Sequence, residues 1–176
     1  MKGLLQAYLA TLWFAFALVI STASTTQAQT SGWGALSISA ARIDYDLSGT
    51  GSAPGFAIRT TRDLSPNVAL EFGGVFAKLE QPLGTSPLFM PEAHIRYRWN
   101  LGRFSPYMSG GMGASLVTSP FHSDWDPTLS IAGGTGVRLT DRLAVVGELR
   151  IRGHQFNFAG STADISAGLA WRLSSF

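Results

Sequence analysis

Two neighbouring segments near the C-terminus alternate apolar residues with small or charged ones, from Leu129 to Leu139 and from Leu143 to Gln155. Successive side chains of a strand point to opposite faces, so a strand separates these residues into two faces, whereas a helix would mix them. In the second segment the apolar face receives Leu143, Val145, Leu149 and Ile151, and the polar face receives Glu148, Arg150, Arg152 and His154. The two segments therefore predict a hairpin between an apolar medium and a polar one.

The same alternation, with turn signals around it, predicts about eight strands along the chain. None of the segments has the pattern of an amphipathic helix. Most are about 9–12 residues long, the length at which a tilted strand crosses a bilayer. The predicted strands are Ala35 to Tyr45, Gly55 to Arg62, Val68 to Leu79, Leu88 to Trp99, Pro106 to Leu116, Leu129 to Leu139, Leu143 to Gln155 and Ala163 to Leu173.

The connections between these strands alternate in length. Residues 63–67, 100–105 and 140–142 form tight turns, whereas 46–54, 80–87, 117–128 and 157–162 are mostly longer and rich in Gly, Ser, Thr and Pro. Outer-membrane barrels combine short periplasmic turns with longer outer loops. The sequence therefore predicts an all-β protein, a closed antiparallel up-and-down transmembrane barrel with both termini in the periplasm and four loops facing the cell exterior.

The N-terminal residues have the features of a secretory signal peptide. Met1 and Lys2 give a positive start, Leu4 to Ile20 form an apolar run, and Thr26 to Ala28 offer a small-residue cleavage site. We expect cleavage after Ala28, so that residues 1–28 are the signal peptide and residues 29–176 the outer-membrane β-barrel domain. The alternative is an anchor that stays in the membrane, since the apolar run approaches the lower length limit for a spanning helix.

Composition excludes several classes of site. The chain has no cysteine, which excludes disulfides and thiolate metal sites. The formal charge of +2 is far from the strongly basic balance of a nucleic-acid-binding protein. We expect no cofactor and no nucleic-acid partner.

The chemistry of the polar face distinguishes a soluble barrel from a membrane barrel. A soluble barrel would carry many lysines outside, yet Lys78 is the only lysine after the leader and arginine supplies the other cations. Arginine forms planar, bidentate pairs with carboxylates, which suits a narrow interior. We therefore expect an ion-pair network in the lumen, formed by Arg59, Glu71, Glu92, His94, Arg96, Arg98, Arg138, Glu148, Arg150, Arg152, Asp164 and Arg172.

Aromatic residues gather near both ends of the predicted strands. One belt, toward the periplasm, consists of Trp33, Tyr97, Trp99, Phe104 and Trp171. The other, toward the outer rim, consists of Phe56, Phe76, Phe89, Phe121 and Phe156. Two aromatic belts are typical of outer-membrane barrels. The alternative is that these are core residues of a soluble sandwich or lipocalin-like barrel.

Two motifs resemble those of the small OmpA-like eight-stranded outer-membrane β-barrel proteins. The first is Ser105-Pro-Tyr-Met-Ser-Gly-Gly-Met-Gly113, and the second is Ala132-Gly-Gly-Thr-Gly-Val-Arg-Leu-Thr-Asp-Arg-Leu143, followed by Glu148. The resemblance covers the leader and most of the barrel, and it implies the architecture and an outer-membrane location without an activity. Such barrels usually end on an aromatic residue in phase with the lipid-facing row. Phe176 is out of phase, so Leu173 would take that place.

Three functional hypotheses follow from the charged interior and the outer loops. An eight-stranded barrel is barely wide enough for its own side chains, so we expect a closed lumen and a monomeric protein with a structural or surface-interaction role. Its partners would be outer-membrane lipid and an extracellular ligand or protein that contacts the loops. The alternatives are a narrow pore for small solutes, because ionisable groups within a membrane are functional candidates, and a lipid A-modifying enzyme.

Two candidate sites near the outer rim give weaker signals. An enzyme is not expected, because Phe156 stands where a serine nucleophile would follow His154. His122, Asp124 and Asp126 in the longest outer loop would suit a divalent cation. A solvated loop with Trp125 as a contact residue is the simpler interpretation, and we expect no metal site.

Overall fold

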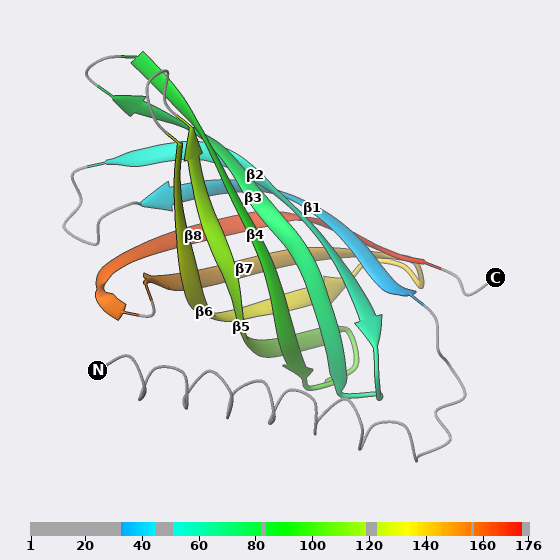
Figure 1. The fold of residues 1–176 in the computed structure, drawn as a ribbon. Helices are drawn as coiled ribbons and strands as arrows, with labels where there is room; N and C mark the ends of the chain where they lie inside the picture. The colour runs from blue at the N-terminus through cyan, green and yellow to red at the C-terminus, as the bar shows by residue number, and fades with distance from the viewer. Residues whose placement is uncertain (1–32, 45–50, 82–83, 119–122, 156, 174–176) are drawn as a thin grey trace, which may run out of the picture. The chain divides into compact units, whose positions relative to one another are not determined.

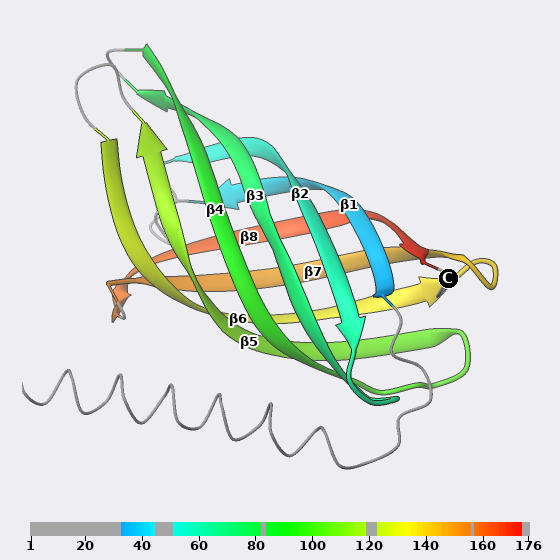
Figure 2. The ribbon, with the colours of Figure 1, turned by 45° about the vertical axis from the view of Figure 1, so that its right-hand side comes forward.

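The computed structural model describes residues 33–44, 51–81, 84–118, 123–155 and 157–173. These residues form a closed antiparallel barrel in which each strand pairs with the next and β1 pairs with β8 (Figure 1, Figure 2). The strands are β1 (Trp33–Asp44), β2 (Ser52–Asp63), β3 (Val68–Gln81), β4 (Gly84–Arg98), β5 (Phe104–Thr118), β6 (Ser123–Arg138), β7 (Leu143–His154) and β8 (Asn157–Arg172). The predicted all-β, up-and-down barrel is confirmed. No helix in the described ranges is long and apolar enough to cross a membrane.

Most strands are longer than the sequence predicts, with 12 residues in β1 and 16 in β6 and β8, whereas β7 ends one residue earlier than predicted, at His154. The extra length lies at the outer end, where β4 begins at Gly84, β6 at Ser123 and β8 at Asn157. Three of the predicted long loops, 80–87, 117–128 and 157–162, are therefore largely strand. Partner strands supply the backbone hydrogen bonds there, so that Gly, Ser and Pro continue the ladder where the sequence alone indicates a turn. In Figure 1 the β3–β4 hairpin reaches to the upper left, beyond the ends of β1 and β2.

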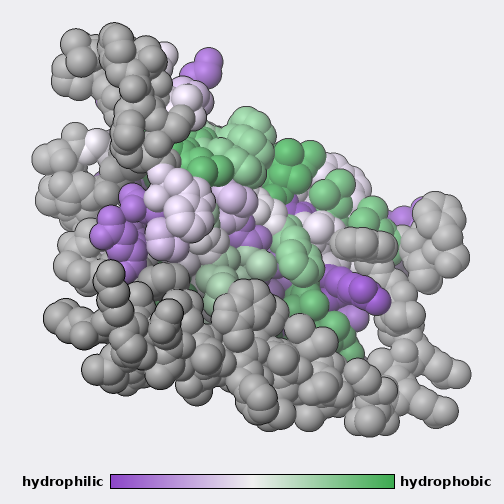
Figure 3. Space-filling model, viewed as in Figure 1, coloured by the Kyte–Doolittle hydropathy of each residue, from purple (hydrophilic) through white to green (hydrophobic). Residues whose placement is uncertain are grey.

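Burial alternates along the strands as expected from the period of two. On β7, Leu149 is 53% exposed, whereas its neighbours Glu148 and Arg150 are 6% and 1% exposed. Figure 3 shows hydrophobic side chains gathered on the outer wall. Outward apolar side chains with large exposed fractions include Ile38, Phe72, Ile131, Leu149 and Ile165. The charged side chains of the middle of the barrel thus lie inside, and the apolar ones face the surroundings.

Several predicted belt residues contact one another on the outer wall. Phe56, Phe76 and Phe89 form a stacked row across β2, β3 and β4, with ring centroids 5.0 and 4.4 Å apart. Near the opposite ends of the strands, Tyr97 and Trp99 make an edge-to-face contact at 4.9 Å. Phe121 and Phe156 lie outside the described residues, as does Phe176 at the C-terminus.

The assignment of faces predicts unequal tolerance of two substitutions. We expect Leu149→Arg to destabilise the barrel by about 2–4 kcal/mol near the bilayer midplane, because it places a guanidinium against acyl chains. Ala170→Ser, on the inward face of β8, should be tolerated. Heat-dependent gel mobility after refolding measures the folded fraction. Equal folding of the two variants would contradict the assignment of faces.

Candidate functional site in the barrel interior

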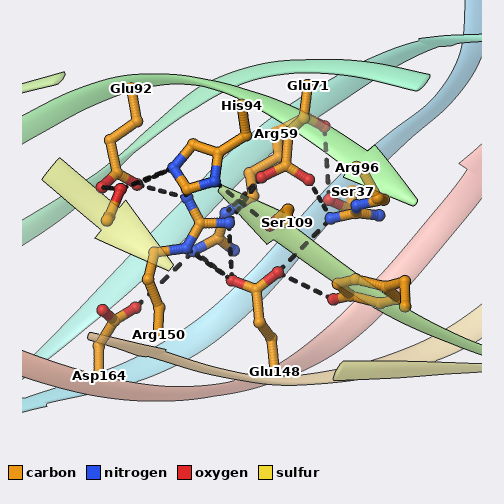
Figure 4. Close-up of polar contacts among 12 residues, drawn as sticks. Ser37, Arg59, Glu71, Glu92, His94, Arg96, Ser109, Glu148, Arg150 and Asp164 are labelled. Atoms are coloured by element: carbon orange, nitrogen blue, oxygen red, sulfur yellow. Dashed lines mark hydrogen bonds and ion pairs between the residues drawn. The ribbon is translucent and has the colours of Figure 1, made fainter. Parts of the chain in front are cut away.

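Arg150 on β7 lies at the centre of a cluster of charged side chains inside the barrel (Figure 4). Its Nη1 lies 2.5 Å from Oε2 of Glu92, its Nη2 lies 2.6 Å from Oε1 of Glu71, and its Nε donates a 3.0 Å hydrogen bond to Oε1 of Glu148. Glu92 and Glu71 come from β4 and β3, on the other side of the barrel from β7. A single arginine thus connects opposite walls across the lumen.

Two further arginines extend this cluster toward β8 and β2. Nε and Nη2 of Arg152 lie 2.5 and 3.0 Å from the two carboxylate oxygens of Glu92, a bidentate pair, and its Nη1 binds Asp164. Nη2 of Arg59 lies 3.2 Å from Oε1 of Glu148 and 3.7 Å from Oδ2 of Asp164. Each arginine therefore contacts at least two carboxylates.

Arg96 and Tyr107 form the periplasmic edge of the cluster. Arg96 pairs with Glu71, and its Nη2 lies 3.5 Å from Oε2 of Glu148. Its guanidinium carbon lies 3.8 Å from the centroid of the Tyr107 ring, a cation–π contact. The Tyr107 hydroxyl donates a 2.9 Å hydrogen bond to the same Oε2 of Glu148. Gly134 makes room for this ring, because a Cβ there would lie 2.5 Å from the hydroxyl.

His94 lies within the cluster between two serines. Its Nδ1 lies 3.2 Å from Oγ of Ser109, and its Nε2 lies 2.8 Å from Oγ of Ser130. Ser130 Oγ also donates a 3.1 Å hydrogen bond to Oε1 of Glu92. A serine, a histidine and a carboxylate are the groups of a hydrolase triad. Here Ser130, His94 and Glu92 are 1%, 2% and 7% exposed, so an ester substrate has no route to the serine oxygen.

The interior cluster is electrically balanced within the described residues, apart from His94. It combines four arginines and four carboxylates, which are Arg59, Arg96, Arg150, Arg152, Glu71, Glu92, Glu148 and Asp164. Burying an unpaired charge costs several kcal/mol, and close pairing offsets much of that cost. The equal numbers allow the barrel to bury all eight groups together.

Nine of the twelve residues expected in the lumen network lie in this cluster, and the other three do not. Arg98 pairs with Asp63 at 3.0 Å, near the turn after β2. Arg138 and Arg172 are exposed at the ends of β6 and β8. Their inclusion in a shared interior network is wrong, because alternation predicts the face of a side chain but not its depth along the barrel axis. Conversely, Tyr107, Ser109 and Ser130 also lie in the interior and are not among the twelve predicted residues, although alternation along β5 and β6 already places them on inward faces.

A second group overlooked in the sequence is an apolar layer in the lumen, on the outer side of the charged cluster. Its largest members include Ile43, Val75 and Met90, which are 0%, 0% and 1% exposed. The layer consists of Ala41, Ile43, Ala53, Ala57, Val75, Ala77, Leu79, Leu88 and Met90. Side chains from β1 to β4 thus fill this part of the lumen.

A small cavity lies on the periplasmic side of the charged cluster. Its volume is about 30 Å³, and the small residues Ser37, Ser39, Ser166 and Ala170 are part of its lining, together with Arg59. A cavity of this size admits one or two water molecules. It is too small for a solute such as a sugar or an amino acid.

The two candidate sites near the outer rim differ from the sequence prediction. His122 lies outside the described residues, and Asp124 and Asp126 belong to strand β6 rather than to a loop. Among the described residues, no group of three His, Cys, Asp or Glu side chains could hold a metal ion. Trp125 is 62% exposed on the outward face of β6. His154 ends β7, and Phe156 beyond it is not described.

The closed eight-stranded barrel, with arginine–carboxylate pairs inside and apolar residues outside, agrees with the comparison to protein families. Residues 13–172 match the model of the outer membrane protein beta-barrel domain. The chain belongs to this family. It is therefore a protein of the bacterial outer membrane. No sequence among curated proteins matches the chain.

Solved barrels of similar fold have little sequence in common with this chain. Neisserial surface protein A is 15% identical, with a TM-score of 0.59 over 80% of this chain and 96% of that one. Ail, the attachment invasion locus protein of Yersinia pestis, is 11% identical, with a TM-score of 0.55 over 80% and 97%. The N-terminal β-barrel domain of OprF from Pseudomonas aeruginosa is 15% identical, with a TM-score of 0.55 over 81% and 99%. These similarities show the fold.

The interior cluster predicts a large effect of removing its central cation. We expect Arg150→Gln to destabilise the barrel by about 3–5 kcal/mol, because it leaves Glu71, Glu92 and Glu148 with an uncompensated negative charge. Urea unfolding in detergent micelles or lipid vesicles measures the loss. Arg62→Gln is the matched control, since Arg62 is exposed at the end of β2. An equally small effect of both substitutions would show that the cluster contributes little to stability.

Proposed function

We propose that this protein is a closed outer-membrane barrel with a structural and surface-interaction role, expressed at its outer end. The observation that carries the proposal is the filled lumen. Arg150 and Arg152, both almost fully buried, connect walls on opposite sides of the barrel, and the apolar layer fills the space above them. A solute could pass only if several buried ion pairs separated together.

The two alternative functions are a pore and a lipid-modifying enzyme, and each requires a feature that the described residues do not provide. A pore requires a continuous wet path, whereas the cavity beside the cluster admits one or two waters. A lipid-modifying enzyme requires a nucleophile within reach of an acyl chain, whereas Ser130 is buried against His94 and Glu92.

Conductance separates the closed barrel from a pore. We expect no steady single-channel current when the refolded protein is inserted in planar bilayers, because the charged cluster occupies the lumen. The control is Arg150→Gln, which removes the central cation and should give occasional current steps if it still folds. Stable, ion-selective steps from the unmodified chain would support the pore and contradict the proposal.

The charge of the outer end indicates which surfaces it would bind. The described strand ends on that side carry two cations, Arg42 and Lys78, and four carboxylates, which are Asp44, Glu80, Asp124 and Asp126. This net negative charge favours a basic or neutral partner. The structure of Ail was solved with the heparin analogue sucrose octasulfate, a polyanion. The acidic outer end of this chain does not support a ligand of that kind here.

A pair of neighbouring substitutions tests this preference. We expect the protein in vesicles to bind a lysine-rich peptide more tightly than heparin at low salt. Glu80→Gln should weaken peptide binding by about two- to threefold, and Lys78→Gln should strengthen it by a similar factor, since single exposed charges contribute little. Both effects should shrink in high salt because of screening. Tighter binding of heparin than of the peptide would overturn the proposal for the outer end while leaving the closed lumen untouched.

A further inference from the structure

Four exposed arginines lie at the periplasmic mouth of the barrel, next to the strand ends at the right of Figure 2. Two directly precede β5 and β7, and two end β6 and β8. They are Arg103, Arg138, Arg142 and Arg172, and we refer to them as the mouth arginines. All four continue the inward alternation of their strands, in phase with Tyr107, Ala132, Glu148 and Ser166, which are buried.

The mouth arginines form two pairs across neighbouring strands. The amide of Arg138 donates a 2.8 Å hydrogen bond to the carbonyl of Arg103, and the amide of Arg172 donates a 2.8 Å hydrogen bond to the carbonyl of Arg142. Each pair continues the strand register by one step. Residues directly opposite on one face have Cβ atoms about 4.5–5.5 Å apart, and like charges in that position repel.

This repulsion is not relieved by the described part of the chain. Asp63, one of the two acidic side chains that the described residues place at this end, pairs with Arg98. The other, Asp141, is exposed, and among the described residues no carboxylate lies within ion-pair distance of a mouth arginine. The interior cluster, in contrast, matches each arginine with carboxylates. Within the described residues, the mouth arginines therefore lack the carboxylate partners that the arginines of the interior cluster have.

The depth of the mouth arginines corresponds to a lipid headgroup. Phe104 and Trp171, each adjacent in sequence to a mouth arginine, are 57% and 40% exposed, and Leu139, adjacent to Arg138, is 57% exposed. Such residues anchor a barrel at the membrane interface. The mouth arginines lie at the last paired positions or just beyond them, where the barrel wall ends, so their long exposed side chains can turn over the rim to the phosphate layer.

We propose that the mouth arginines bind phosphate groups of anionic phospholipids in the inner leaflet of the outer membrane. Two guanidiniums that face one another can each donate two hydrogen bonds to a shared phosphate. A phosphate between the two guanidiniums attracts both of them and so offsets their mutual repulsion. Basic clusters at a membrane surface attract anionic lipid in this way. This site is independent of the role proposed for the outer end.

Lipid exchange tests the proposal on the full mature barrel. The unmodified protein, extracted gently from mixed vesicles of phosphatidylglycerol and phosphatidylcholine, should retain phosphatidylglycerol in mass spectra. Replacing all four mouth arginines by Gln should weaken this retention by up to about a thousandfold, since each cation near a membrane surface contributes about fivefold. The double replacement Arg42→Gln and Lys78→Gln, at the outer end, is the control and should retain the lipid. Equal retention by all three proteins would overturn the proposal.

The unfolding temperature of the barrel gives a second test, because the four substitutions should affect it differently in phosphatidylcholine and in phosphatidylglycerol. In phosphatidylcholine alone, the variant with four Gln residues should unfold at the same temperature as the unmodified protein or higher, because it lacks the repulsion. In phosphatidylglycerol, the unmodified protein should gain stability and the variant should not. Inorganic phosphate added to phosphatidylcholine vesicles distinguishes a soluble anion from a lipid. If it stabilises the unmodified protein as well as phosphatidylglycerol does, the lipid assignment is wrong.

Discussion

The pairing of β1 with β8 is the constraint on which the rest of the structure depends. A bilayer offers no water to backbone groups, so a sheet can cross it only without free edges. The two strands pair along nearly all of β1, from Ala35 opposite Arg172 to Asp44 opposite Ala163, and this pairing closes the barrel. Closure in turn imposes one inward and one outward face on every strand. The composition of each face then determines where the protein can reside and what its interior can do.

A narrow closed barrel must fill its interior with its own side chains. This chain uses charged side chains in the middle and apolar side chains toward the outer end. Charged groups in the middle are matched in number and bridged from wall to wall, as around Arg150. Toward the outer end, Ile43, Val75 and Met90 belong to a cluster of buried apolar side chains from β1 to β4. An apolar layer above a neutral ionic layer stabilises the fold while it separates the periplasmic cavity from the outer end. This combination suits a protein whose interactions take place at its ends.

How far the sequence predicted this structure depends on the kind of pattern. Strict alternation, as on β7, correctly predicted the strand and its faces. The apolar layer was missed because Leu88, Phe89 and Met90 are all apolar, so the alternation disappears where both faces are hydrophobic. The predicted strand boundaries were wrong near Gly84 and Pro127, which lie in paired strands. Turn-forming residues are tolerated there because a neighbouring strand continues the ladder. Arg138 and Arg172 were assigned to the correct face but to the wrong depth.

Depth along the axis also explains why charge is balanced in the middle and unbalanced at both ends. An unpaired charge in the lumen would carry the full cost of desolvation, whereas at the ends water, ions or headgroups can supply the counter-charge. The described interior accordingly holds equal numbers of arginines and carboxylates, while the periplasmic end is rich in arginine and the outer end in Asp and Glu. Only the ends can carry a net charge without this desolvation cost. The opposite signs at the two ends are the basis of the different partners that we propose on the two sides of the membrane, because an exposed net charge can attract a partner of the opposite charge.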